Sequence, residues 1–141
     1  MKFKLRRLVE SDYDTLVKWW KDWKWEPIPQ DFLPENGTGG FMVTKDKKEI
    51  CAGFIYLTNS KVAWIEFVIS NKQYKGKDRK DAIQFLINSL SAVAQQTGAK
   101  YGYAVLKHKG LKFYYENSGF FESDRNITEM ITIWQSQQEQ Q

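Results

Sequence analysis

The chain has 141 residues, the length of one ordinary domain, and its 42% hydrophobic and 27% charged content excludes general disorder. Its single cysteine and single histidine exclude an internal disulfide and a zinc cluster, and its net charge of +4 favours anionic ligands without indicating nucleic-acid binding by itself. The sequence shows no signal peptide and no apolar run long enough to span a bilayer, so we expect a cytoplasmic protein with no membrane partner.

The first forty residues predict a strand, a helix and a long loop. Residues 3–9 begin with alternating apolar side chains, which is typical of a strand. Ser11 then predicts a helix N-cap, with Asp14 as its capping-box partner. Five apolar residues recur at helical spacing and form one stripe: Tyr13, Leu16, Val17, Trp20 and Trp23. Trp19 falls outside this stripe. Residues 25–40 contain all three prolines and predict an irregular loop.

The rest of the chain predicts a sheet with two further helices. Strands are expected, in chain order, at residues 41–44, 50–57, 62–69 and 101–106, with a closing hairpin of residues 120–121 and 127–134. An amphipathic helix is expected at residues 79–96 and a short helix at 109–117, with Gly98 and Gly119 just past their ends. The long helix connects two strands and predicts that they are parallel. We expect one domain over residues 1–134, with Cys51 in its core, and a polar tail over 135–141.

The turn between the central strand and the long helix has the composition of an anion site. It carries Lys75, Gly76, Lys77 and Arg79 directly before and at the start of the helix. The first backbone N–H groups of a helix have no partner inside it, and the helix dipole adds positive potential, so together they can bind a phosphate. A single glycine in the turn excludes both a P-loop and a dinucleotide fingerprint.

This turn, Q-Y-K-G-K-D, resembles the acyl-CoA pyrophosphate loop of the GNAT N-acyltransferase family, Q/R-x-x-G-x-G/A, through Gln73 and Gly76. Asp78 departs from that pattern, which has glycine or alanine at this place. A carboxylate there could repel a diphosphate. Downstream, L-K-F-Y-Y-E-N-S-G-F resembles the family's Y-E-x-x-G-F pattern, with Tyr115 at its tyrosine and Gly119 at its glycine. The stretches W-W-K-D-W and L-P-E-N-G-T-G-G resemble small phage-encoded members, which would place the protein in the cytoplasm of a host.

The resemblance implies an α/β (α+β) fold with a mixed sheet of six or seven strands flanked by helices. It implies transfer of an acetyl or other acyl group from acetyl-CoA to an amine acceptor by direct attack, with no metal. Backbone groups of the central strand would hold the pantetheine arm and polarise the thioester carbonyl. The CoA-binding residues that it implies are Val68, Ile69, Ser70, Tyr74, Lys75, Gly76, Lys77, Asp78, Arg79 and His108.

Two titratable residues are the catalytic candidates. Glu66 is the only charge in the run V-A-W-I-E-F-V-I, and burial would raise its pKa toward that of a usable general base. Its alternative is a structural ion pair with a lysine or arginine. Tyr115 is the candidate general acid for the leaving thiolate, because an unperturbed tyrosine is protonated at neutral pH. Its alternatives are a half-buried aromatic, or the same role taken by Tyr114.

Aromatic residues supply candidate contacts for the acceptor. Trp23, Trp25 and Trp64 could stack on a planar acceptor or could simply cover the core. Two other functions stay open. The departure at Asp78 and the phage-like wording allow a GNAT-fold protein that binds without catalysing, associated with a virion or with nucleic acid. The tryptophan-rich loop and the basic charge allow an enzyme that modifies DNA bases.

Overall fold

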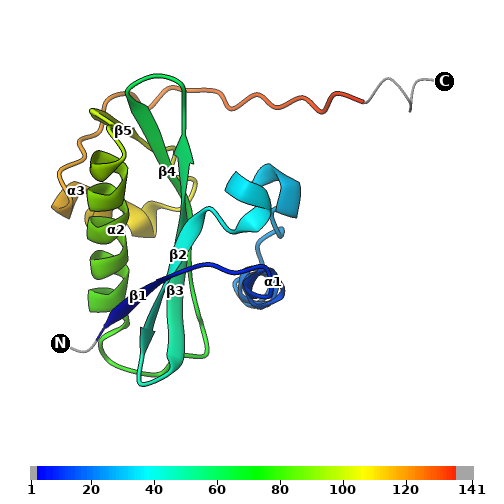
Figure 1. Cartoon of the computed structure of the whole chain (residues 1–141), viewed down its shortest axis with the longest axis vertical. Coiled ribbons are helices and arrows are strands. Elements are labelled where there is room, and N and C mark those ends of the chain that lie inside the picture. Colours follow the sequence, from blue (N-terminus) through cyan, green and yellow to red (C-terminus); the bar gives the residue numbers. More distant parts are fainter. Residues whose placement is uncertain (1–2, 136–141) are drawn as a thin grey trace.

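The structure, a computed structural model, describes residues 3–135, so all but the first residue of the tail expected at 135–141 lies outside the described residues. In this part of the chain five strands form one mixed sheet, with α2 against one face and α1 on the other (Figure 1). The strands are β1 (Lys4–Arg7), β2 (Gly40–Lys45), β3 (Lys48–Leu57), β4 (Val62–Ser70) and β5 (Tyr101–Tyr103). The helices are α1 (Asp12–Asp22), α2 (Arg79–Gln96) and α3 (Lys112–Asn117), with short 3-10 turns η1 (Gln30–Phe32), η2 (Pro34–Gly37) and η3 (Lys109–Leu111).

The strands follow the chain across the sheet in the order β1-β2-β3-β4-β5. The first four are antiparallel neighbours, and β5 pairs parallel to β4 after the α2 crossover, as the sequence predicts. Asp46 and Lys47 join β2 to β3 as a two-residue turn in which both residues have positive φ, 51° and 66°. Turns of this kind match the twist of a hairpin.

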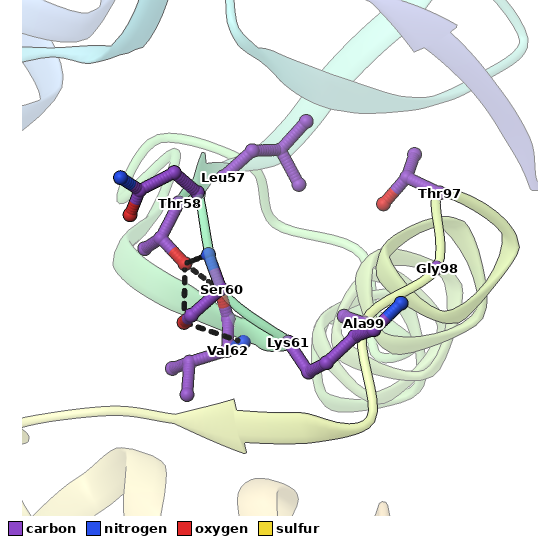
Figure 2. Close-up of a pocket in the computed structure, with 9 residues that line it drawn as sticks. Leu57, Thr58, Ser60, Lys61, Val62, Thr97, Gly98 and Ala99 are labelled. Carbon is purple, nitrogen blue, oxygen red and sulfur yellow. Dashed lines mark hydrogen bonds between the residues drawn. The ribbon is translucent and has the colours of Figure 1, made fainter.

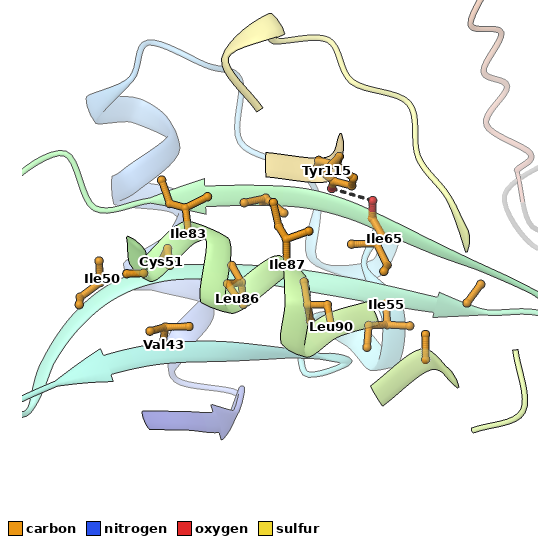
Figure 3. Close-up of a cluster of buried hydrophobic side chains, with 14 residues drawn as sticks. Val43, Ile50, Cys51, Ile55, Ile65, Ile83, Leu86, Ile87, Leu90 and Tyr115 are labelled. Carbon is orange, nitrogen blue, oxygen red and sulfur yellow. Dashed lines mark hydrogen bonds between the residues drawn. The ribbon is translucent and has the colours of Figure 1, made fainter. Parts of the chain in front are cut away.

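The larger core lies between α2 and the sheet (Figure 3). Leu86 and Leu90 on α2 are fully buried against strand residues that include Cys51, whose burial raises the pKa of the thiol. Gly53 allows the close approach of the helix, because a Cβ there would lie 2.9 Å from Cδ1 of Leu90. The predicted α2 stripe and the core position of Cys51 are confirmed.

A second core fills the opposite face, and it corrects one expectation for α1. Trp19, expected outside the apolar stripe, is as buried as Trp20, with 3% of each side chain exposed. The reason is the loop after α1, which folds back over the helix. Leu33 from this loop joins the same cluster, and the Tyr13 hydroxyl donates to the Ile28 carbonyl at 2.6 Å. A wider face of the helix is therefore covered.

The predicted capping box at the start of α1 is wrong. Ser11 has a helical backbone, with φ −67° and ψ −15°, and its side chain makes no capping bond. The buried carboxylate of Asp12 instead accepts the Val9 N–H at 2.8 Å and pairs with Arg6 at 2.8 Å. Burial alone would raise the pKa of Asp12, but the hydrogen bonds from Arg6 and Val9 lower it below its ordinary value.

The expected closing hairpin of residues 120–121 and 127–134 does not form, so the described sheet has five strands rather than six or seven. The strand expected at 101–106 covers only Tyr101–Tyr103, because the chain then leaves β4. An edge of three residues offers few backbone groups for a hairpin to pair with. The last described residues run away from the sheet as an extended segment (Figure 1).

Within residues 3–135, no helix combines the length and the apolar composition that a bilayer crossing requires.

Candidate functional site

β4 and β5 separate beyond their last paired residues, Trp64 and Tyr103, and a bulge in β4 lies at this strand separation. Two residues of β4, Phe67 among them, face the single residue Gly53 of β3. Phe67 has φ 56°, a conformation that bulky side chains rarely adopt and that costs about 1–3 kcal/mol. Strained residues of this kind cluster at functional sites, so the bulge marks the strand separation as a candidate site. The sequence analysis missed Phe67, and glycine within β3 is the signal that could have indicated the bulge.

The Glu66 side chain lies in the strand separation, next to the bulge. Its Oε2 accepts the backbone N–H of Val105 at 2.9 Å, where β5 has left β4. Burial raises the pKa of Glu66 to about 7, the Val105 hydrogen bond opposes the rise, and the charge of Glu129 adds to it. The alternative was a structural ion pair between Glu66 and a lysine or arginine. No such ion pair occurs among the described residues, and the nearby Lys107 pairs with Glu129 at 2.9 Å. A carboxyl group with this pKa can act as a general base near neutral pH.

Tyr115 lies on the α2 side of the same strand separation. Its side chain is 2% exposed, and its hydroxyl donates to the Ile65 carbonyl at 2.9 Å (Figure 3). Burial raises the pKa of this hydroxyl, and the charge of Glu66 adds to the rise. Tyr114 points elsewhere: burial raises its pKa too, but the next contributions come from Arg79 and Asp81 in the first turn of α2. The Tyr115 hydroxyl therefore lies near Glu66, and the Tyr114 hydroxyl lies near the start of α2.

The carboxylate of Asp78, in the turn before α2, is hydrogen-bonded to two side chains. One carboxylate oxygen accepts Lys45 Nζ at 2.5 Å and the other accepts the Tyr74 hydroxyl at 2.7 Å. These two hydrogen bonds lower the pKa of Asp78. The negative charge is thus compensated by a cation from β2, and the expected repulsion of a diphosphate is reduced.

The same turn presents unpaired donors. In the described structure, the backbone N–H groups of Lys75, Gly76 and Lys77 make no hydrogen bond. Arg79 begins α2, donates weakly to the Asn71 carbonyl at 3.5 Å, and lies 5.7 Å from the ring centre of Trp23. Free amides, a helix N-terminus and cationic side chains at one place can bind an anion.

Three of the predicted contact residues form a stack of rings between two loops. The Trp25 and His108 rings are parallel within 8° with centroids 3.8 Å apart, and Trp23 stacks on Trp25 at 5.9 Å. Trp23 Nε1 also donates to the Ser70 carbonyl at the end of β4, at 2.8 Å. The loop after α1 thereby meets the loop after β5. Trp64 lies outside this stack, on the ring of Tyr103 at 4.2 Å.

The remaining predicted residues on β4 contribute backbone rather than side chains. Val68 and Ile69 are buried, with 5% and 1% exposed, so only their peptide groups could face a ligand. Two cavities of about 350 and 340 Å³ lie elsewhere. The first is formed by the β3–β4 turn and the end of α2, at the opposite end of β4 from the Gly76 turn (Figure 2). Neither cavity contains a predicted site residue. The two titratable candidates, Glu66 and Tyr115, lie at the strand separation.

Solved structures share the fold of this chain. A glucosamine-6-phosphate N-acetyltransferase from Arabidopsis thaliana aligns with a TM-score of 0.63 at 13% identity, over 94% of this chain and 100% of that one. An aminoglycoside N-acetyltransferase in complex with CoA aligns with a TM-score of 0.63 at 13% identity, over 93% and 95% of the two chains. An acetyltransferase from Trypanosoma brucei aligns with a TM-score of 0.61 at 18% identity, over 92% and 100%. The chain has the GNAT acyltransferase fold.

The GNAT fold was the one expected from the two motifs, and that expectation is confirmed. No protein-family sequence model matches the chain, and no curated protein sequence does either. The GNAT fold at such low identity does not define an activity, and one aligned structure, from Bacillus halodurans, is described as a transcriptional regulator. What the chain does must therefore be argued from its own site.

Proposed function

We propose that this protein is an N-acyltransferase that moves an acetyl group from acetyl-CoA to an amine. The observation that carries the proposal is the position of Glu66, a carboxyl group of pKa about 7 beside a strained bulge where β4 and β5 separate. The turn at the far end of β4 supports it with free amides and the cationic start of α2. Two aligned acetyltransferase-fold structures are complexes with CoA.

The reaction needs a base for the amine, donors for the carbonyl oxygen, a diphosphate site and a surface for the acceptor, besides an acid for the leaving thiolate. The amine nitrogen attacks the thioester carbonyl carbon, a C–N bond forms, and the C–S bond breaks to release a thiolate. Glu66 takes the proton of the amine, directly or through a water. Backbone N–H groups of β4 between Val68 and Ser70 polarise the carbonyl oxygen, and Lys75, Gly76, Lys77 and Arg79 bind the diphosphate of CoA. The stack of Trp23, Trp25 and His108 borders the site and favours a planar or apolar acceptor beside it.

Titration calorimetry with acetyl-CoA is the first test of this proposal. We expect binding, followed by release of free CoA thiol when amine acceptors are added. Absence of acetyl-CoA binding would remove the transferase proposal. Binding without thiol release on a broad amine panel would support the second candidate, a GNAT-fold binding protein. That candidate is favoured by the side chains of Glu66 and Tyr115, which already bond within the strand separation.

Tyr115 is proposed as the acid that protonates the thiolate, which requires its hydroxyl to leave the Ile65 carbonyl. We expect Tyr115→Phe to lower kcat at least about tenfold with little change in acetyl-CoA affinity. The lost buried hydrogen bond should also lower the free energy of unfolding by about 1 kcal/mol. Steady-state kinetics and chemical denaturation measure the two effects. Tyr114→Phe is the matched control, and the acid is Tyr114 if only that variant slows turnover.

Gly76→Ala tests the turn. A Cβ at Gly76 would lie 2.5 Å from the Tyr74 hydroxyl oxygen, so the Tyr74 ring must move and release Asp78. We expect acetyl-CoA binding to weaken several-fold in calorimetry while the circular dichroism spectrum is unchanged. Gly110→Ala is the matched control, because a Cβ there would meet nothing within 4 Å. Equal affinities of the two variants would show that the turn does not hold the diphosphate.

A further inference from the structure

A pair of stacked rings marks the start of the strand separation. Trp64 of β4 is in register with Tyr103 of β5, and their ring centroids lie 4.2 Å apart. The two strands are paired up to this point and separate beyond it, where Glu66 follows on β4. Because Glu66 is two residues from Trp64, both side chains lie on the same face of β4, roughly 7 Å apart along the strand.

Further rings continue this surface across the sheet. Tyr56 of β3 is the register partner of Trp64 on its other side. The ring of Phe67, the strained residue of the bulge, lies 6.2 Å from the ring of Tyr56 and 5.9 Å from that of Phe32 in η1. Burial raises the pKa of the Tyr56 hydroxyl, and the charge of Glu66 adds to the rise, so Tyr56 lies near this carboxyl group. We call five residues the ring surface: Phe32, Tyr56, Trp64, Phe67 and Tyr103.

The ring surface lies on the face of the sheet opposite α2, and part of it is open. Tyr56 and Phe67 pack against the second core, and the Tyr56 hydroxyl donates to the Phe32 carbonyl at 2.9 Å, which holds η1 over this face. Phe32 and Tyr103 are 46% and 48% exposed, and the other rings are half-buried. A ligand that reaches Glu66 from this face therefore meets aromatic side chains.

The charges near Glu66 disfavour a second charge on the acceptor. Besides burial and the hydrogen bond from Val105, the charges of Glu129 and Lys107 affect the pKa of Glu66, and these two side chains pair with each other at 2.9 Å. The ammonium form of an acceptor amine can pair with Glu66. A second ammonium or a carboxylate on the same acceptor would lose its hydration without gaining a free partner. Contact between aromatic rings, in contrast, contributes about 0.5–1.5 kcal/mol beyond the buried area.

We propose that the acceptor is an arylalkylamine, a primary amine joined by a short carbon chain to an aromatic ring that packs on the ring surface. This inference rests on the proposed acetyl transfer. A chain of two carbons places the nitrogen roughly 5 Å from the ring centre, which is comparable to the spacing of Glu66 and Trp64 on β4. The nitrogen attacks the thioester carbonyl carbon and its proton passes to Glu66. A C–N bond forms, the C–S bond breaks, and the products are an N-acetyl amide and the thiol of CoA.

A matched panel of amines tests the proposal, with release of the CoA thiol as the readout. The panel contains phenethylamine and tryptamine as arylalkylamines, cyclohexylethylamine as an apolar amine of the same shape without an aromatic ring, and spermidine as a polyamine. We expect kcat/KM for the two arylalkylamines to exceed that for cyclohexylethylamine at least about fivefold and that for spermidine at least about tenfold.

Trp64→Leu tests the ring surface directly. We expect KM for phenethylamine to rise about tenfold, while the affinity for acetyl-CoA in calorimetry stays within about twofold of wild type, since the ring contact is lost and the Gly76 turn is not touched. Tyr103→Leu, at a half-exposed site of β5, should act in the same direction and provides a second variant if Trp64→Leu does not fold. Trp134→Leu is the matched control: Trp134 is 87% exposed and lies outside the ring surface, so this variant should behave as wild type.

The outcomes separate this inference from the proposed function. If acetyl-CoA binds and no amine of the panel releases thiol, the proposed transfer fails and the inference fails with it. If thiol is released equally fast with cyclohexylethylamine or spermidine, the transfer stands and the arylalkylamine inference is overturned. The same conclusion follows if folded Trp64→Leu and Tyr103→Leu both keep the wild-type KM for phenethylamine.

Discussion

Replacing Glu66 with glutamine should lower kcat for acetyl transfer at least about a hundredfold, because general base catalysis contributes roughly 10²–10⁴-fold. Acetyl-CoA affinity should stay nearly the same, since Glu66 lies in the strand separation and not in the turn that precedes α2. Glutamine keeps a carbonyl oxygen that can accept the Val105 N–H, so the local structure should be retained. Thiol-release kinetics and calorimetry measure the two quantities. Glu10→Gln, an exposed site before α1, is the control and should behave as wild type.

The pH dependence gives Glu66→Gln a second readout. The base acts only when deprotonated, so wild-type kcat should rise with pH and level off above the pKa of about 7. At pH 5.5 it should be about thirtyfold below its plateau. The residual activity of Glu66→Gln should not follow this curve. A wild-type profile without a transition near pH 7, or a variant that keeps the same transition, would assign the base to another group.

The same pKa affects stability, and its sign is opposite to that of a paired carboxylate. The folded state holds the Glu66 proton up to about pH 7, whereas an unfolded glutamate, with its ordinary pKa of 4.5, releases it earlier. Between these values the folded state binds more protons, so the free energy of unfolding falls as pH rises. Because the side chain is partly exposed, the loss should be on the order of 1–2 kcal/mol rather than the full value of roughly 3. Denaturation measures the free energy of unfolding of wild type and of Glu66→Gln at pH 5 and at pH 8. The difference between the two proteins should change by this amount from one pH to the other.

Most of the sheet and both long helices could be predicted, because periodicity and end signals are local. The stripe on residues 79–96 and the glycine at position 98 needed no distant partner to be interpreted, and Gly98 has the expected positive φ of 102°. Residues 127–134 show the limit of such reasoning. They have a strand-forming pattern, but a pattern cannot say whether the neighbouring edge is long enough to pair with. The prediction of a hairpin was wrong because β5 is only three residues long.

The candidate site could be located but not assembled from the sequence. The Gly76 turn and Glu66 stood out because a helix start and a lone charge in an apolar run are local features. Asp78 stood out only as a charge that could repel a diphosphate, and its compensating partner Lys45, 33 residues away in the chain, could not be foreseen. The stack of Trp25 on His108 likewise joins two loops that no local pattern connects. Contacts of this kind require the folded chain.

Arg79→Glu should raise the dissociation constant for acetyl-CoA at least about tenfold at low salt, with the difference shrinking as salt screens the charges. Arg79 is the first residue of α2, beside the free amides of the turn, and its substitution removes a cation where the diphosphate would lie. A carboxylate in the first turn of a helix is favourable to the helix dipole, so the variant should fold. The loss would then report ligand binding and not stability.

The control for Arg79→Glu must change the total charge equally without touching the turn. Lys61→Glu does so: Lys61 is exposed beside the cavity of Figure 2, at the opposite end of β4 from the turn. If affinity depended only on net charge, both variants would weaken binding alike, and the assignment of the diphosphate to the start of α2 would fail. If the turn holds the diphosphate, Lys61→Glu should bind acetyl-CoA within about twofold of wild type, because an exposed charge at the other end of β4 is largely screened at moderate salt. The difference between the two variants, measured by calorimetry at two salt concentrations, separates a local site from a general attraction of an anion to a basic protein.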